Sequence, residues 1–215
     1  GLDIVGIQEV DQFVNRSGNQ DTMKILSESS GLEYYTFFRA ILHDGGEYGL
    51  GILSRYPIVS TSRKLLNSQG NEQRVLGKAV IDVDGEKINF FVTHLSYEDM
   101  TLNAAQTMTV IKELRDTHGN FILTGDFNTN STMKEYTSFV ETLGVTNARD
   151  SAETVLNHKA TYAGFKKPGS CDGGRCIDHI FHNDKAAVKL FNTIIEDNMH
   201  LGSDHLPIYA DVALS

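Results

Sequence analysis

The sequence is poor in several features that mark particular classes of protein. Its 215 residues include two cysteines, three prolines and no tryptophan. Two cysteines are too few for a disulfide scaffold, and structural zinc needs four ligands, for which no second cysteine pair exists. The scattered prolines provide no proline-rich linker, which favours one continuous domain over residues 1–215. No stretch approaches 18 consecutive apolar residues, so the sequence predicts no membrane-spanning helix.

Positive charge is also scarce. The chain has 19 Lys and Arg against 28 Asp and Glu, which gives a formal net charge of −9, and no basic run is longer than Lys166-Lys167. An electrostatic nucleic-acid clamp gains its affinity from many phosphate contacts, so this balance disfavours such a clamp. It does not exclude an enzyme that acts on phosphoesters with a bound metal, because some of the acids are then expected to be metal ligands.

The two cysteines and the start of the chain leave the compartment open. Cys171 and Cys176 are separated by four residues in a glycine-containing loop. They either close a small disulfide loop or remain two free thiols, and the sequence favours neither strongly. The chain starts at Gly1 and enters the apolar run Ile4–Ile7 without a basic region or a cleavage motif, so no signal peptide is visible.

Apolar runs of strand length recur along the chain and are interrupted by three helical patterns. Strands are expected near Asp3–Val10, Tyr35–Leu42, Tyr48–Ser54, Ile58–Leu66, Arg74–Val83, Lys87–His94, Asn120–Phe127, Cys176–His182, Val188–Ile195 and Pro207–Leu214. Asp84-Gly85 predicts a two-residue hairpin turn. Helices are expected at Thr22–Ser30, at Leu102–Thr117 and after Ser131, which would cap the third. Strands outnumber helices, so we expect an α/β (α+β) fold with mainly antiparallel sheets and helices packed outside.

Polar residues gather where the expected strands end. They are Glu9, His94, Asp126, Asn128, Asp178, Asp204 and His205. Strands that end at one rim of a sheet bring distant polar residues into one pocket. Each has a simpler reading: Glu9 and Asp204 as loop residues, His94 as a hydrogen-bonded core histidine, and Asp126 with Asn128 as a turn. Asp178 fits such a reading poorly, because a carboxylate inside an apolar strand needs a partner.

Six short motifs occur in an order that resembles the endonuclease/exonuclease/phosphatase superfamily. They are Gln8-Glu9, Glu47-Tyr48-Gly49 with Ile52-Leu53-Ser54, Thr93-His94-Leu95, Gly125-Asp126-Phe127-Asn128, Ile177-Asp178 and Ser203-Asp204-His205. The resemblance covers the whole chain and is greatest to small bacterial metal-dependent hydrolases. It implies a DNase I-like, four-layer α-β-β-α sandwich with two mainly antiparallel sheets. It also implies that the family's first strand and helix are absent, together with an Asn that contacts the metal.

The resemblance implies a metal site beside a water-activating group. Glu9 is expected to anchor Mg²⁺ or Mn²⁺, which prefer oxygen ligands, and Asp204 to assist it. Asp126 is expected to orient or deprotonate the attacking water, while Asn128 contacts the phosphate or that water.

Two histidines and an arginine complete the implied site. His205 is expected to hydrogen-bond a phosphoryl oxygen, with Asp178 holding its ring in the useful tautomer. His94 is the second imidazole, and Glu47 is a candidate to orient it. Arg74 is either a phosphate contact or a solvated strand arginine.

These features predict a divalent-metal-dependent phosphohydrolase, foremost a phosphodiesterase that cleaves a P–O bond by in-line attack of an activated water. The rival is a catalytically silent module that binds a phosphate ligand; the presence of Asp126, Asn128 and His205 favours the enzyme. The substrate is a phosphodiester or a phosphomonoester, so a nuclease, a sphingomyelinase and an inositol-phosphate phosphatase all stay open. Nucleic acid is a possible substrate, although the sequence contains no strong basic patch to bind it. We expect the protein to be a monomer.

Overall fold

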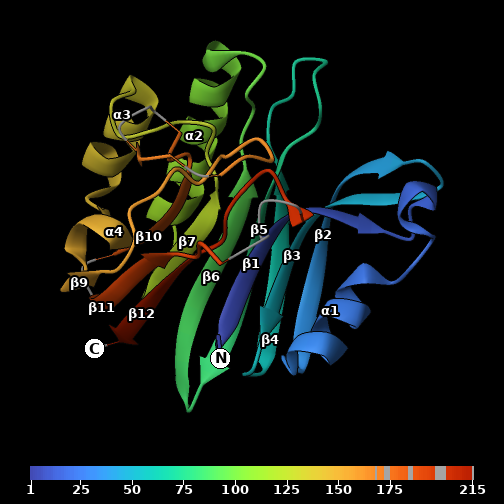
Figure 1. Cartoon of the computed structure of the whole chain (residues 1–215), viewed down its shortest axis with the longest axis horizontal. Coiled ribbons are helices and arrows are strands. Elements are labelled where there is room, and N and C mark those ends of the chain that lie inside the picture. Colours follow the sequence, from blue (N-terminus) through green and yellow to red (C-terminus); the bar gives the residue numbers. More distant parts are fainter. Residues whose placement is uncertain (168, 172–174, 184–185, 197–201, 215) are drawn as a thin grey trace. The chain divides into compact units, whose positions relative to one another are not determined.

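The computed structural model describes residues 1–167, 169–171, 175–183, 186–196 and 202–214. The chain divides into two compact units, Gly1–Gly125 and Asp126–Ser215 (Figure 1). In the described part of the chain, every helix is too short or too polar to cross a membrane. Whether the chain behaves as the single domain expected from the sequence stays a prediction.

The first unit contains strands of two sheets. Three strands form one sheet in the order β1 (Ile4–Gln12), β3 (Gly46–Ser54), β2 (Tyr34–His43). The other runs in the order β4 (Ile58–Leu65), β5 (Val75–Val83), β6 (Glu86–His94), β7 (Phe121–Asp126). The neighbouring pairs β1/β3, β2/β3, β4/β5 and β5/β6 are antiparallel.

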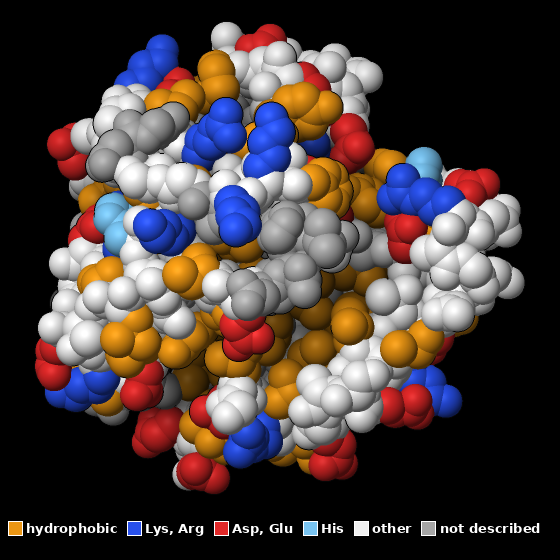
Figure 2. All heavy atoms as spheres, in the orientation of Figure 1, with side chains coloured by type: hydrophobic (Ala, Val, Ile, Leu, Met, Phe, Trp, Pro, Cys, Tyr) orange, Lys and Arg blue, Asp and Glu red, His pale blue; other side chains and the backbone are white. Residues whose placement is uncertain are grey.

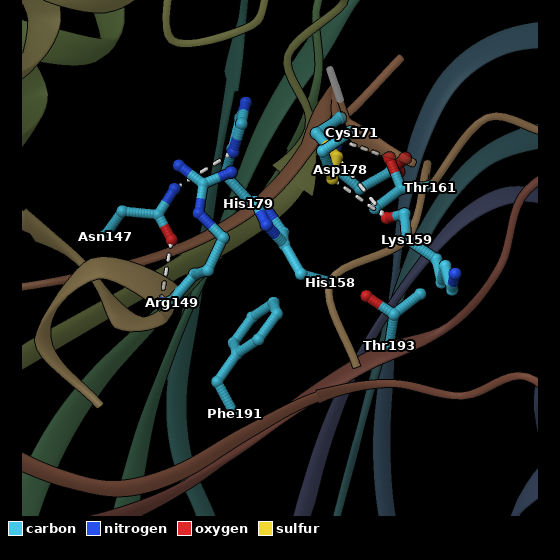
Figure 3. Close-up of a pocket in the computed structure, with 11 residues that line it drawn as sticks. Asn147, Arg149, His158, Lys159, Thr161, Cys171, Asp178, His179, Phe191 and Thr193 are labelled. Carbon is cyan, nitrogen blue, oxygen red and sulfur yellow. Dashed lines mark hydrogen bonds between the residues drawn. A yellow bond between two sulfur atoms is a disulfide. The ribbon is translucent and has the colours of Figure 1, made fainter. Parts of the chain in front are cut away.

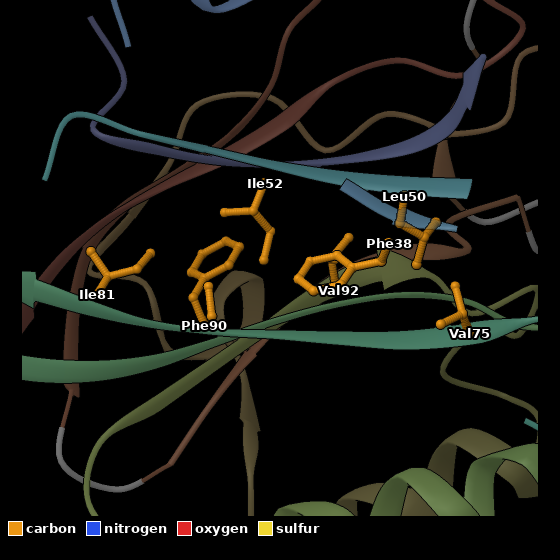
Figure 4. Close-up of a cluster of buried hydrophobic side chains, with 8 residues drawn as sticks. Phe38, Leu50, Ile52, Val75, Ile81, Phe90 and Val92 are labelled. Carbon is orange, nitrogen blue, oxygen red and sulfur yellow. The ribbon is translucent and has the colours of Figure 1, made fainter. Parts of the chain in front are cut away.

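The core of this unit lies between the two sheets (Figure 4). Phe38, Leu50 and Ile52 of the first sheet meet Val75, Ala79, Ile81, Phe90 and Val92 of the second. Side chains alternate across a strand, so each strand sends every second residue into this layer. The close approach leaves no room at Gly77, where a Cβ would lie 2.3 Å from the Phe38 ring.

Helices cover the outer faces of the two sheets. Helix α1 (Thr22–Ser30) buries Met23 against Val10, Leu32 and Leu53, and the Asp21 side chain caps its first turn. Helix α2 (Met100–Arg115) begins at the capping residue Asp99 and buries an apolar face made of Leu102, Val110, Ile111 and Leu114. The two helices lie on opposite sides of the paired sheets in Figure 1, so this unit has the order helix, sheet, sheet, helix. A short 3₁₀ helix, η1 (Asn15–Ser17), precedes α1.

The second unit is built from shorter elements. Strand β10 (Asp178–His182) pairs with β8 (Thr146–Asn147), and β11 (Ala186–Thr193) lies between β12 (Ile208–Leu214) and β9 (Thr154–Val155). The β9/β11 pair is parallel. Helix α3 (Lys134–Leu143) contributes Tyr136 and Phe139 to an aromatic cluster with Phe127, His179 and Phe181. Helix α4 (Ala148–Ser151) follows β8 directly.

The α+β fold class expected from the sequence is confirmed, and its long elements match closely. Asp84 and Gly85 both have positive φ, 53° and 97°, as a two-residue hairpin turn between β5 and β6 requires. One capping prediction is wrong: α3 begins after Met133 with no side-chain cap, and Ser131 lies outside it. The sequence does not predict four short elements, namely β8, β9, α4 and η1. Each has too few residues to show a periodic pattern of apolar residues.

Candidate active site

In the first unit, Glu9 and His94 lie close together. Strand β1 changes register between Ile7 and Val10, and Glu9 at this irregularity has φ 58°, a left-handed conformation that is rare for a residue other than glycine. Its carboxylate is 56% exposed, and Oε1 lies 4.0 Å from Nδ1 of His94 at the end of β6. The bulge therefore directs an accessible carboxylate toward the imidazole.

Arg74 is buried beside His94, so the reading of Arg74 as a solvated strand arginine is wrong. Its side chain is 4% exposed, and its Nη1 lies 3.0 Å from Nδ1 of His94 and 2.9 Å from the carboxylate of Glu72. Nη2 lies 3.6 Å from Glu98. A guanidinium only donates hydrogen bonds, so Nδ1 of His94 accepts, and a neutral ring then carries its proton on Nε2.

Glu47 has a different neighbour from the one expected. Its Oε1 accepts a 2.8 Å hydrogen bond from Nη1 of Arg39, across the β2/β3 pair. Nδ1 of His94 lies 3.0 Å from Nη1 of Arg74. A role for Glu47 in orienting His94 stays a prediction.

In the second unit, the His205 ring lies between two carboxylates. Its Nδ1 is 2.8 Å from Oδ2 of Asp178, the first residue of β10. Its Nε2 is 3.7 Å from Oδ2 of Asp126, which is almost fully buried at the end of β7. The carboxylate in an apolar strand thus has the partner that its burial requires.

The surroundings of His205 favour its charged form. Burial opposes the charge and is the largest single influence on the ring. The hydrogen bond and the charge of Asp178, with the charges of Asp126 and Asp204, overcome this and raise the pKa of His205 to about 9. At neutral pH the ring is therefore an imidazolium with a proton on each nitrogen, and both nitrogens are donors.

The turn after β7 fixes Asp126. The backbone N–H of Asn128 donates to Oδ1 of Asp126 at 2.8 Å, and Asn128 itself has φ 51°. Asparagine tolerates this left-handed conformation better than most residues. The turn that is the simpler interpretation of Asp126 and Asn128 is present, and Oδ2 of Asp126 lies 3.7 Å from Nε2 of His205.

Two backbone connections hold the segments around His205. The carbonyl oxygen of Asp204 accepts hydrogen bonds from the N–H groups of Ala163 and Gly164 at 2.7 and 3.0 Å. The hydroxyl of Thr161 accepts from the N–H of Asp178 at 3.1 Å. Tyr162 packs its ring 5.1 Å from that of His205. The segment 161–164 therefore joins the chain around Asp178 to the chain around Asp204.

The buried histidine His179 makes a hydrogen bond to the segment that follows the Asp126 turn. His179 is 2% exposed, its Nε2–H donates to the carbonyl of Thr129 at 2.7 Å, and its Nδ1 accepts from the side-chain amide of Asn147 at 3.0 Å. Figure 3 shows Asn147 and His179 joined in this way. Burial lowers the pKa of His179 to about 4, so the ring is neutral. No local pattern in the sequence reveals that the partner of His179 is the carbonyl of Thr129.

The donor atoms in the second unit suit a hard divalent cation. Oxygens of Asp126 and Asp178 and a ring nitrogen of His205 lie within 4.8 Å of one another. The His205 imidazolium carries a proton on each nitrogen and cannot bind a metal, so only the carboxylate oxygens of this group are potential ligands, and Mg²⁺ and Mn²⁺ prefer oxygen. Cys171 and Cys176 lie near His158 but are joined in a disulfide, so they supply no thiolate.

Known proteins share the fold of this chain. The model of the Endonuclease/Exonuclease/phosphatase family matches residues 1–205. Among solved structures, a mannosyl-6-phosphatase of Bacteroides thetaiotaomicron is 21% identical with a TM-score of 0.77, over 99% of this chain and 86% of that one. The human Nocturnin catalytic domain is 18% identical with a TM-score of 0.72, over 99% and 81%. Sphingomyelinase C of Streptomyces griseocarneus is 17% identical with a TM-score of 0.72, over 98% and 86%.

Proposed function

Because the chain belongs to the Endonuclease/Exonuclease/phosphatase family, we propose that it is a divalent-metal-dependent phosphohydrolase, foremost a phosphodiesterase. The observation that carries the proposal is the arrangement of His205 between Asp178 and Asp126. It combines a charged donor with a buried carboxylate within 4 Å, and attack of water on a phosphoester needs both a donor for the phosphoryl oxygen and a base for the water.

Each side chain of the second unit then has a defined task. The His205 imidazolium donates from Nε2 to a phosphoryl oxygen, while Asp178 holds Nδ1–H and so fixes the ring plane. Oδ2 of Asp126, which faces His205, accepts the proton of the attacking water as the new O–P bond forms and the bond from phosphorus to the leaving oxygen breaks. Asn128 keeps Asp126 in position through its backbone N–H and presents its own amide to the phosphate or the water.

The side chains of the first unit are assigned in the same way. His94 donates from Nε2 to phosphate or to the leaving oxygen, because Arg74 occupies Nδ1. Arg74 supplies positive charge, as expected of a phosphate contact. Glu9 and Asp204, each in its own unit, are proposed as carboxylate ligands of Mg²⁺ or Mn²⁺. When bound, the ion withdraws negative charge from the phosphoryl oxygens, which otherwise repel the nucleophile.

The test is hydrolysis of bis-(p-nitrophenyl) phosphate with Mg²⁺, with Mn²⁺ and with EDTA. We expect metal-dependent activity that Asp126→Asn lowers about 10²–10⁴-fold, the contribution typical of a general base. Asp211→Asn is the matched control, because Asp211 is an exposed carboxylate on β12. No activity with either metal, or equal rates for Asp126→Asn and Asp211→Asn, contradicts the proposal.

The ester class is tested by a second substrate. The Bacteroides neighbour is a phosphatase of a sugar monoester and the Streptomyces neighbour cleaves sphingomyelin, so the fold alone does not choose. We propose a diester and expect faster turnover of bis-(p-nitrophenyl) phosphate than of p-nitrophenyl phosphate. A panel of plasmid DNA, RNA, sphingomyelin and inositol phosphates then separates the nuclease, sphingomyelinase and phosphatase alternatives.

A further inference from the structure

Exposed positive charge in the second unit collects in the segment that precedes Asp178. Four cations, Lys159, Lys166, Lys167 and Arg175, fall within 17 consecutive positions of an acidic chain. We call the described part of residues 159–175 the basic loop. Lys166, Lys167 and Arg175 are exposed, and Lys159 is half-buried. In Figure 2, Lys and Arg side chains gather in the upper middle of the visible face.

Ion pairing distinguishes these four cations from the other cations that the structure describes in the same unit. Lys134 lies beside Glu135, Arg149 beside Asp150, and Lys189 beside Glu153. Within the residues that the structure describes, none of the four cations of the basic loop lies within 4.0 Å of a carboxylate oxygen. Their charge is therefore available to a ligand.

Backbone hydrogen bonds join the two ends of the basic loop to each other and join the loop to Asp204. The carbonyl of Arg175 accepts from the N–H groups of Thr161 and Tyr162, both at 3.0 Å. Gly164, which donates to Asp204, precedes Lys166 by two residues, and two residues span at most about 7 Å. The three exposed cations thus branch from the segments that carry Asp178 and His205.

From this placement we propose that the substrate carries a second anionic group, such as a phosphate or a carboxylate, beyond the phosphoester that is cleaved. The inference rests on the proposed function and names its substrate class. The loop's three exposed cations bind the second group, while His205 binds the first. Three cations are too few for a polyanion held by many phosphate contacts, so the favoured ligand is a compact molecule with two anionic groups rather than a nucleic acid.

Two phosphonates that differ only at their far end test the proposal. Hexylphosphonate and hexane-1,6-diylbisphosphonate share a spacer and a C–P bond that this reaction does not cleave. Their dissociation constants are measured by titration calorimetry with Mg²⁺, and their inhibition constants against bis-(p-nitrophenyl) phosphate. We expect the bisphosphonate to bind about tenfold more tightly at low salt. This ratio should shrink toward 2, the factor for two equivalent ends, at 0.5 M salt, because salt screens exposed charges.

The variant that removes the three exposed cations, Lys166→Ala with Lys167→Ala and Arg175→Ala, should reduce the ratio to about 2. It should leave the affinity for hexylphosphonate and the kcat for bis-(p-nitrophenyl) phosphate within twofold of wild type. Lys134→Ala is the matched control and should keep the tenfold ratio. A wild-type ratio of 2 or less, or a tenfold ratio in the triple variant, overturns the proposal.

Binding of a single-stranded oligonucleotide tests the alternative that the ligand is a nucleic acid. For three contacts, the logarithm of its affinity should fall with the logarithm of salt concentration with a slope of about −2. A steeper slope together with tighter binding than the bisphosphonate overturns the compact ligand in favour of nucleic acid. The calorimetric ratio is measured whether or not hydrolysis occurs. Loss of hydrolysis with a retained ratio therefore contradicts the proposed function alone, and hydrolysis without the ratio contradicts this inference alone.

Discussion

Replacing Asp178 by asparagine should lower the pKa of His205 by a predictable amount. The asparagine keeps an oxygen that accepts from Nδ1–H, so the ring stays in place while the negative charge 2.8 Å away is lost. The pKa of His205 is about 9 against an ordinary value of 6.5. That difference of about 2.5 units favours the imidazolium by about 3 kcal/mol. Burial, which opposes the charge, remains in the variant, so we expect a pKa below 7.5.

The assay is an NMR titration of the His205 ring in protein freed of metal with EDTA. The resonance is assigned by its absence from the spectrum of His205→Gln. Asp211→Asn serves as the control for loss of an exposed carboxylate and should leave the titration unchanged. A pKa near 7 in the wild type, or a pKa above 8.5 in Asp178→Asn, refutes the account of this pair.

The same pair predicts how stability depends on pH in the metal-free protein. The pKa of His205 is raised on folding, so the folded state binds more protons than the unfolded state between pH 6.5 and 9. The contribution to the free energy of unfolding, about 3 kcal/mol, is fully present below pH 6.5 and is lost as the pH rises through 9. Urea unfolding at pH 6 and pH 9.5 should show this loss in the wild type and much less of it in Asp178→Asn.

Three further predictions concern the scaffold. The lowered pKa of His179, about 4, means that its stabilising contribution is lost as the pH falls from 6.5 toward 4. His179→Gln should remove about 2 kcal/mol of the difference in unfolding free energy between pH 7 and pH 5, and an unchanged difference is inconsistent with a neutral buried ring. Ile52→Ala empties a fully buried position between the two sheets and should lower the free energy of unfolding by about 2–5 kcal/mol in urea titrations; a loss below 1 kcal/mol argues against that packing. Opening the Cys171–Cys176 disulfide as Cys171→Ser with Cys176→Ser should destabilise the chain by about 2 kcal/mol through loop entropy, and an equal urea midpoint for both forms contradicts this.

Local patterns in the sequence are enough to predict the long elements. Helix α1 occupies Thr22–Ser30 as its spacing predicts, because Asp21 caps it and Gly31 ends it. The β5/β6 hairpin follows from Asp84-Gly85, since the turn needs positive φ at both residues. These signals are contained within a few neighbouring residues, so one sequence suffices to read them.

Contacts between distant residues cannot be predicted in that way. The sequence points to Asp178 and His205 through a resemblance, but not to the hydrogen bond from Asp178 N–H to Thr161. The burial of Arg74 against His94 is equally hidden, because nothing local distinguishes a buried strand arginine from a solvated one. Contacts between residues distant in the sequence depend on which strands pair. Strand pairing depends on the whole sheet and not on a few neighbouring residues.

Two of the proposed functional residues have backbone conformations that suit glycine. Glu9 and Asn128 have φ values of 58° and 51°, and a left-handed residue other than glycine costs about 1 kcal/mol or more. Glycine at either position would relieve that strain, yet it would delete the carboxylate or the amide on which hydrolysis is proposed to depend. Selecting variants by melting temperature alone would therefore favour glycine at these positions and so enrich variants without the proposed activity. Melting temperature and turnover must be measured together in any engineered variant of this protein.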